Sequence, residues 1–199
     1  MILHIIFVEQ KFFESMVLKS IFVKTDLKLK KMKRLFLLLA ILLIGKVLFA
    51  QTFVVPKDYV FNTPEDFRKY EQQIIQCIDY LCQTPLNKEV ANRQAASEFF
   101  IKWIYGTPDI EIVVYKKIIP FINNKPLFEI FLCGYVAKEI EFKSENKVLD
   151  CYINGIKHVV QFYEKNRKQV RRSVSVEKYA KLYKERKLEQ YLKQKLEEL

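Results

Sequence analysis

The fold is decided by residues 126–142, PLFEIFLCGYVAKEIEF, in a chain of 199 residues. Proline is favoured in the first turn of a helix, so we expect a helix from Pro126 to about Phe142. Gly134 in its middle costs about 1 kcal/mol relative to alanine, and we expect a closely packed neighbour to compensate. Apolar residues occupy most sides of this helix, which predicts the central, most buried element: Leu127, Phe128, Ile130, Phe131, Leu132, Val136 and Ile140.

The next segment predicts a partner helix from Glu145 to Asn166, with Ser144 as its N-cap. Gly155 lies inside this helix as Gly134 lies inside the first, and it indicates a second point of close approach. One face is apolar at helical spacing: Val148, Cys151, Tyr152, Ile156, Val159 and Tyr163.

Two further helices are expected upstream. Residues 63–66, TPED, combine a hydroxyl N-cap, a first-turn proline and acids that face the positive end of the helix dipole. The pattern from Asn87 to Tyr105 predicts the second helix, and Gly106 is a natural C-terminal stop. The first helix carries one apolar stripe and ends at Thr84-Pro85: Phe67, Tyr70, Ile74, Ile78 and Leu81.

The segment that joins the second helix to the central one has a different pattern. Ile110, Ile112 and Val114 recur at every second position, which predicts at most one short extended segment near 110–115. No obvious partner strand exists for it. Residues 117–122 predict a single helical turn interrupted by Pro120.

The last part of the chain, residues 165–199, is strongly basic, with 12 basic and 5 acidic residues. Residues 176–196 return to a helical period, and the charged run Lys184–Lys187 is a place where this stretch could divide in two. The chain is therefore predicted to be all-α. We expect a single domain of four main helices at 51–164, and a basic helical extension at 165–199 that packs on the domain or trails from it.

The segment from Met32 to Gln51 has the pattern of a secretory signal peptide. Two basic residues precede ten apolar residues at 35–44, and Ala50 offers a small residue before a polar one. A bilayer-spanning helix needs about 20 apolar residues, so a permanent anchor fits less well. We expect export through the inner membrane, cleavage after Ala50, a periplasmic or secreted location, and no transmembrane helix in the mature chain.

Residues 1–31 precede this signal and show no sustained helical period. We interpret them as a start-site extension, with Met32 as the biological start. The alternative is that they form a long, genuine N-terminal region of the signal. Export also argues against nucleic acid as the reason for an isoelectric point of about 9.4.

The four cysteines, Cys77, Cys82, Cys133 and Cys151, all lie in the part expected to be exported. An oxidising compartment permits disulfides. Cys77 and Cys82 are five residues apart, about 140° apart around a helix, so they cannot pair without breaking it. If a disulfide exists, we expect it to join Cys133 to Cys77 or to Cys151.

No catalytic, metal-binding or nucleotide motif is present, so no catalytic residue, metal or cofactor is predicted. His158 is the single histidine after the signal, and general acid-base chemistry needs several convergent groups. Zinc needs three or four ligands at a recognisable spacing. Glu139 and Glu141 are two positions apart on a helix and therefore diverge.

The basic extension is the remaining candidate site. Its cations predict contact with an anionic surface, namely lipid headgroups, an acidic polysaccharide or a partner protein. The alternative is a solvated helix face whose long side chains cover apolar surface. The candidate contact residues are Lys165, Arg167, Lys168, Arg171, Arg172, Lys181, Lys184, Arg186 and Lys187.

Short runs along residues 62–192 resemble a group of small exported proteins of unassigned function from Gram-negative bacteria. The resemblance implies a helical domain and an exported location, and it implies no activity. Arg186 stands where such proteins are expected to have glycine. The runs that carry the resemblance are TPED at 63–66, Tyr70-Glu71, TPLN at 84–87, FIKW at 100–103, GTP at 106–108, FYEKN at 162–166 and EKY at 177–179.

These observations predict a non-enzymatic, exported envelope protein that binds a partner protein or an anionic surface. One alternative is a hydrolase or transferase with an unrecognised carboxylate site, which requires a deep pocket lined by two or more carboxylates. The other is a structural or assembly factor for another exported protein.

Overall fold

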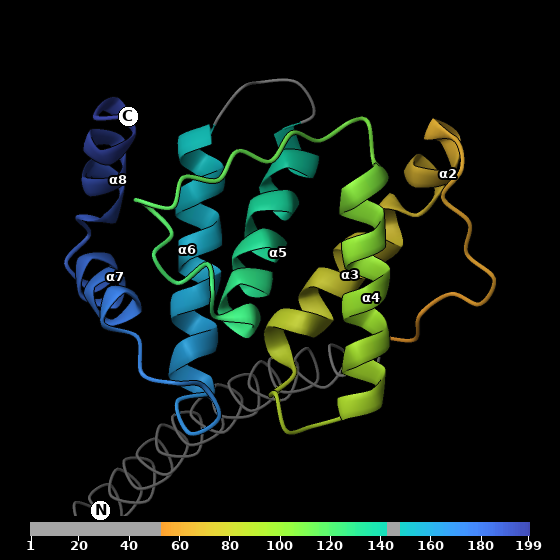
Figure 1. Ribbon diagram of the computed structural model, residues 1–199, viewed down its shortest axis with the longest axis horizontal. Coiled ribbons are helices and arrows are strands. Elements are labelled where there is room, and N and C mark those ends of the chain that lie inside the picture. The colour runs from red at the N-terminus through yellow and green to blue at the C-terminus, as the bar shows by residue number, and fades with distance from the viewer. Residues whose placement is uncertain (1–52, 143–147) are drawn as a thin grey trace, which may run out of the picture. The chain divides into compact units, whose positions relative to one another are not determined.

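The computed structural model describes residues 53–142 and 148–199, and their fold class is all-α, as predicted (Figure 1). They contain no β-strand. Their helices are α2 (Pro64–Lys69), α3 (Glu71–Gln83), α4 (Val90–Gly106), α5 (Lys125–Phe142), α6 (Val148–Lys165), α7 (Val174–Lys184) and α8 (Leu188–Glu197).

Helix α5 lies at the centre, between α3 and α6 (Figure 1). Helix α4 packs on α3, while α7 and α8 both pack on α6. Residues Thr52–Leu199 form one compact unit. None of the helices in the described ranges is long and apolar enough to cross a membrane.

Glycines let α5 and α6 approach each other closely, as the sequence predicts. A Cβ added at Gly134 would lie 2.8 Å from the carbonyl oxygen of Asn154 and from the Cα of Gly155. A Cβ added at Gly155 would lie 2.7 Å from the ring of Phe131. The amide of Asn154 donates a hydrogen bond to the Gly134 carbonyl at 2.8 Å. The two backbones therefore touch where larger residues would hold them apart.

The first predicted helix is divided at Tyr70, so the prediction of one continuous helix is wrong there. Tyr70 adopts φ −96° and ψ 1°. The carbonyl of Phe67 accepts hydrogen bonds from the Tyr70 amide at 3.2 Å and from the Trp103 indole at 2.9 Å. The Trp103 indole thus links the end of α2 to α4 at the point where the chain turns into α3.

Helix α4 begins at Val90, three residues later than predicted, because Glu89 has a left-handed backbone with φ 46°. It ends at Gly106, as predicted. Gly106 does not have a positive φ, so glycine is needed here for its small size and not for its backbone conformation. A Cβ at this position would overlap the ring of Phe67, which packs directly against it.

Residues 110–115 are extended and pair with no strand in the described part of the chain. The hydroxyl of Tyr152 in α6 accepts from the Tyr115 amide at 2.8 Å and donates to the Val113 carbonyl at 3.0 Å. One buried side chain thus replaces the missing strand partner. Residues 116–123 form consecutive turns instead of the predicted helical turn.

The C-terminal extension packs on the domain and consists of two helices. Its first helix, α7, begins at Val174 with the Ser173 hydroxyl as its cap, slightly earlier than the predicted return to helix at Val176. Tyr179 and Leu192 are buried, and the Tyr179 hydroxyl donates to the carbonyl of Ile118. The chain divides within the predicted charged run, where Arg186 has a left-handed backbone with φ 58°.

Three predictions concern residues outside the described ranges. They are the signal peptide at 32–50, the start-site extension at 1–31, and the beginning of the fourth helix with its cap at Ser144.

Candidate functional site

The turn after α6, residues 165–172, is the most basic short segment in the described part of the chain, and we call it the basic turn. Two buried residues fasten it. Asn166 is 1% exposed, and its side chain accepts from the Leu86 amide at 3.0 Å and donates to the Phe162 carbonyl at 2.9 Å. Val170 is buried, and its amide donates to the Asn166 carbonyl at 3.0 Å. The turn is therefore held in one conformation.

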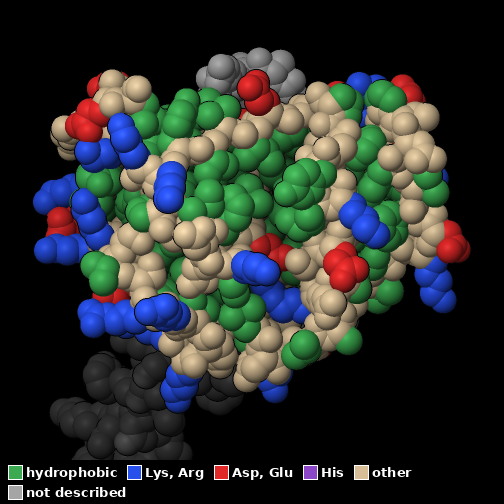
Figure 2. All heavy atoms as spheres, viewed as in Figure 1, with side chains coloured by type: hydrophobic (Ala, Val, Ile, Leu, Met, Phe, Trp, Pro, Cys, Tyr) green, Lys and Arg blue, Asp and Glu red, His purple; other side chains and the backbone are tan. Residues whose placement is uncertain are grey.

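The nine predicted contact residues are all exposed. In Figure 2 the Lys and Arg side chains gather along the edge formed by α7 and α8. Five of the nine belong to the basic turn, and the other four belong to α7 or to the break that follows it.

Four of the nine cations contact carboxylates. Arg172 pairs with Glu177 at 3.1 Å, and Lys184 pairs with Glu164 of α6 at 3.1 Å. Lys181 and Lys187 both approach the same carboxylate, Glu185, at 3.9 and 3.0 Å. The α7 cations are therefore largely balanced by acids on the protein itself.

The remaining cations form no ion pair within residues 53–142 and 148–199: Lys165, Arg167, Lys168, Arg171 and Arg186. Four of these five lie in the basic turn. The Arg167 guanidinium stacks over the Tyr163 ring, 5.4 Å from its centroid. Within the described residues, four of the five cations of the basic turn thus have no ion pair, whereas Lys181, Lys184 and Lys187 each contact a carboxylate.

Tyr163 and Glu177 join the basic turn to α7. The Tyr163 hydroxyl accepts from the Ser173 amide at 3.1 Å and donates to Glu177 at 3.3 Å. The hydrogen bond from Arg172 lowers the pKa of the Glu177 carboxyl. Glu177 therefore stays ionised, and it holds the end of the turn against the first turn of α7.

Val174 stands directly beside the basic turn, at the start of α7, and is 74% exposed. This largely exposed β-branched residue follows Arg171 and Arg172 closely in the sequence and adds an apolar side chain at the end of the basic turn. Single exposed apolar residues are common on protein surfaces, so the position of Val174 matters here more than its exposure.

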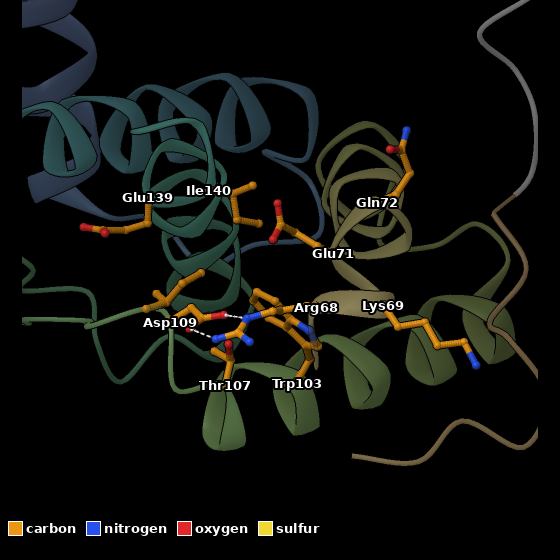
Figure 3. Close-up of a pocket in the computed structure, with 10 residues that line it drawn as sticks. Arg68, Lys69, Glu71, Gln72, Trp103, Thr107, Asp109, Glu139 and Ile140 are labelled. Atoms are coloured by element: carbon orange, nitrogen blue, oxygen red, sulfur yellow. Dashed lines mark hydrogen bonds and ion pairs between the residues drawn. The ribbon is translucent and has the colours of Figure 1, made fainter. Parts of the chain in front are cut away.

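A second candidate site is a cavity of ≈ 570 Å³ between α2, α3, the end of α4 and α5. Figure 3 shows its lining side chains. Three of them are carboxylates from separate parts of the chain, Glu71, Asp109 and Glu139. The pocket thus has the carboxylates that the enzyme hypothesis calls for.

Arg68 and Asp109 form the best-defined contact in this pocket. Arg68 donates from Nε to Asp109 Oδ2 at 2.8 Å and from Nη2 to Oδ1 at 3.0 Å. These hydrogen bonds raise the pKa of Arg68. In Figure 3, Lys69 points away from the cavity, whereas the Glu71 carboxylate points towards Ile140. Glu139 accepts a hydrogen bond from the Cys151 thiol at 3.3 Å.

All four cysteines are free thiols in the structure. Cys77, Cys133 and Cys151 are buried, and Cys82 is half-buried. The Cys77 thiol donates to the carbonyl of Ala96 in α4 at 3.2 Å. The predicted pairings of Cys133 with Cys77 or Cys151 stay predictions.

His158 contributes to neither candidate site. Its Nδ1 lies 2.8 Å from the Asn154 carbonyl, next to Gly134, where α5 and α6 are in closest contact. Within the described ranges, no group of three or more His, Cys, Asp or Glu side chains could hold a metal ion.

Sequence reasoning found the basic turn and missed the pocket. The turn is visible because its cations are consecutive in the chain. The pocket assembles residues from four separate segments, and no spacing links Arg68 to Asp109 or Glu71 to Glu139. One sequence feature points to the pocket. Residues 107–109, TPD, follow the end of α4 and place an acidic residue there.

Comparison of the chain with protein-family models, with curated proteins and with solved structures finds no match. The resemblance to small exported helical proteins therefore stays a prediction.

Proposed function

We propose that this is an exported, non-enzymatic protein that binds an anionic lipid surface through the basic turn. The observation that carries the proposal is the separation of charges in the C-terminal region. Lys181, Lys184 and Lys187 contact Glu164 or Glu185, whereas four exposed cations of the turn have no ion pair with a carboxylate of the described residues. An anionic ligand gains most from charges that are not already neutralised.

The fixed conformation of the turn supports this proposal. Asn166 and Val170 fasten the backbone, so binding need not order it first. Only the exposed side chains lose freedom when a ligand arrives. Preorganisation of this kind strengthens binding without adding a contact.

The position of Val174 favours lipid over polysaccharide. Proteins that lie on membranes combine basic side chains at the headgroups with apolar groups that enter the acyl boundary. Val174 is 74% exposed beside Arg171 and Arg172, and can supply such an apolar group. An acidic polysaccharide would use the same cations and would leave Val174 without a role.

The exported location is part of the same proposal and rests on residues 32–51. The expected test is intact-mass analysis of the protein recovered from the envelope or medium of a bacterium that expresses the full chain. A mature chain that begins at Gln51 is the expected result. A chain that begins before Met32 would contradict both the start site and the cleavage.

The binding test uses the chain from Gln51 to Leu199, which keeps the compact unit and removes the apolar run at 35–44. Vesicles that contain anionic phosphatidylglycerol are sedimented with the protein, in parallel with neutral phosphatidylcholine vesicles. The test variant is R167Q/K168Q/R171Q. Each cation near an anionic membrane contributes about 1 kcal/mol, so we expect the affinity to fall on the order of 100-fold.

The matched control is K181Q/K184Q/K187Q, which removes the same number of charges from cations that already contact carboxylates. We expect this variant to lose less than about tenfold, since its cations are partly neutralised. Equal losses in both variants would show that net charge alone drives binding. Absence of vesicle binding in the unsubstituted protein would reject the lipid proposal, and binding to an acidic polysaccharide would then replace it.

The pocket favours a second candidate function, a hydrolase or transferase that uses carboxylates. The specific observation is that Glu71, Asp109 and Glu139 all line one cavity of ≈ 570 Å³, a size that fits a small molecule. Figure 3 shows the Glu71 carboxylate pointing towards Ile140, which also lines the cavity, and Glu71 is our candidate for general acid-base work.

Nitrophenyl esters, phosphates and glycosides test this second function. Turnover that is lost in E71Q and kept in E141Q would support it, because Glu141 is exposed and pairs with Lys138 outside the pocket. Turnover that survives E71Q, or no turnover with any of these substrates, would count against it.

A further inference from the structure

The loop between α3 and α4, residues 84–89, lies beside the basic turn. The Leu86 amide in this loop donates a hydrogen bond to the side chain of Asn166, which belongs to the turn, at 3.0 Å. Figure 1 shows the loop and the turn after α6 at the same end of the helices, in the lower part of the view. Two segments 80 positions apart in the chain therefore form one continuous part of the surface.

The α3–α4 loop is held in one conformation, as the basic turn is. Arg93 of α4 is buried, and its Nη1 donates to the carbonyls of Leu81 at 2.6 Å and Thr84 at 3.0 Å. Within the loop, the Lys88 amide donates to the Pro85 carbonyl at 3.0 Å. A ligand that reaches this loop therefore need not order its backbone first.

The exposed side chains of this loop and of the first residue of α4 repeat the combination found at the basic turn. Lys88 is exposed and forms no ion pair within residues 53–142 and 148–199. Val90 is 62% exposed. Glu89, which lies between them, accepts a hydrogen bond from the Tyr80 hydroxyl at 3.0 Å, so its carboxylate is directed to α3. The first turn of α4 contains no acidic residue, so no first-turn acid offsets the positive end of the helix dipole.

We propose that Lys88 and Val90 form a second contact with the same anionic lipid surface that the basic turn binds. This inference rests on the proposed lipid binding and adds a segment of the chain to it. Lys88 supplies a cation for the headgroups, and Val90 supplies an apolar side chain for the acyl boundary. Because the loop and the turn belong to one compact unit, the second contact forms with the first already in place.

The first test measures affinity, with the chain from Gln51 to Leu199 and vesicles that contain phosphatidylglycerol. The test variant is K88Q/V90S. This variant loses one cation and one exposed apolar side chain, so we expect its affinity for the vesicles to fall on the order of tenfold. Circular dichroism confirms that the variant keeps its helices.

The matched control is K102Q/Y105S, at the other end of the same helix. Lys102 is exposed and Tyr105 is 86% exposed, so this variant also loses a cation and an exposed apolar side chain. Residues 90 and 105 are about 22 Å apart along the helix axis, which is more than the distance over which salt screens a charge. We expect the control to change the affinity by less than about twofold.

The second test measures contact with the membrane interior. The chain has one tryptophan, Trp103, which is 2% exposed, so an added tryptophan can be followed against a low background. The variants V90W, V174W and Y105W are mixed with phosphatidylglycerol vesicles whose acyl chains carry bromine, which quenches tryptophan fluorescence. We expect quenching in V90W and V174W, and no quenching beyond that of the unsubstituted protein in Y105W.

The outcomes separate this inference from the proposal on which it rests. Quenching in V174W without quenching in V90W would overturn the second contact and leave binding by the basic turn in place. Equal affinities for K88Q/V90S and K102Q/Y105S would do the same. Absence of vesicle binding in the unsubstituted protein would overturn both proposals together.

Discussion

Helix α6 has two very different sides. Towards α5 it meets backbone and apolar groups, with Gly134 against Gly155 and no space for a further methyl group. Towards α7 it uses apolar residues together with an ion pair, Lys184 to Glu164 at 3.1 Å. Packing of α6 against α5 thus depends on close fit of the two helices, whereas packing against α7 combines buried apolar residues with an ion pair.

This difference indicates where residues can be substituted without a large loss of folding stability. Close-packed interfaces lose free energy when even one methyl group is added or removed. Exposed ion pairs contribute about 0–1 kcal/mol each, so their residues can be replaced at little cost to the fold. A binding surface is therefore better placed on the α7 side of α6 than on the α5 side.

The largest expected effect comes from Phe131→Ala. The Phe131 ring is fully buried and lies against Gly155, Tyr135 and Tyr152. Removal of the ring leaves a cavity where α5 and α6 pack most closely. We therefore expect the free energy of unfolding to fall by about 3–5 kcal/mol. Urea unfolding followed by circular dichroism measures it. An effect no larger than that of Leu192→Ala in α8 would remove the distinction between the two sides.

Gly134→Ala tests the contact between backbones directly. Alanine normally stabilises a helix by about 1 kcal/mol relative to glycine, so a neutral site would show a gain. Here the added methyl group meets the backbone of α6 at 2.8 Å, and we expect a net loss of about 2 kcal/mol. A gain in stability would contradict the close approach of α5 and α6.

Gly155→Ala is the comparison for that prediction. Its methyl group would lie 2.7 Å from the Phe131 ring, which can move, and 2.9 Å from the Phe131 carbonyl oxygen, which moves less easily. We expect a smaller loss than for Gly134→Ala in the same urea measurement. An equal or larger loss would show that the Phe131 ring is as immobile as the backbone.

Alkaline pH should lower the folding stability of the reduced protein, mainly through buried cysteine and tyrosine side chains in α3, α5 and α6. Burial raises the pKa of Cys77 and Cys133 above the ordinary 9.0, and it raises the pKa of Cys151 and Tyr152 to about 12. The unfolded chain releases these protons at lower pH than the folded chain. Unfolding then releases protons, so stability falls as pH rises above about 9, by about 1.4 kcal/mol per pH unit for each such group.

Urea midpoints between pH 7 and pH 10.5 measure this slope under reducing conditions. C151S should reduce the slope, because serine does not ionise in this range. In contrast, Tyr179 is the single group in α7 and α8 whose pKa is raised by burial among the described residues. Stability that stays constant up to pH 10.5 would contradict the prediction.

The smallest expected effect is a gain from Arg186→Gly. Arg186 holds a left-handed backbone with φ 58°, which costs a residue with a Cβ about 1 kcal/mol and costs glycine little. We expect the thermal midpoint to rise by an amount equivalent to about 0.5–1 kcal/mol. Arg186→Lys keeps the Cβ and should give no gain. Equal midpoints for the two variants would show that the left-handed backbone carries no cost.

The sequence predicted the α5–α6 side well because its signals are local. A run of apolar residues on all sides of one helix, a stripe on the next, and a glycine in each were sufficient to indicate the central pair and its close contact. The basic turn was predictable for the same reason, since Arg167, Lys168, Arg171 and Arg172 follow one another closely.

The division between α2 and α3 was not predictable from local pattern. The apolar stripe continues through Tyr70, and the hydrogen bond found at the break, from the Trp103 indole to the Phe67 carbonyl, comes from another helix. The pocket has the same origin, since Arg68 meets Asp109 only after α4 has packed on α3. The α2–α3 break and the pocket both involve hydrogen bonds between residues that are far apart in the sequence.

The side chain of Asn166 also makes the basic turn observable from a distance. Its oxygen accepts the Leu86 amide proton across 80 positions of the chain, while its nitrogen is held by Phe162. Hydrogen exchange of the Leu86 amide therefore requires its hydrogen bond to the Asn166 side chain to break. A ligand that settles on the turn should slow that exchange, so a single amide signal in a nuclear magnetic resonance spectrum can report occupancy of a surface that it does not touch.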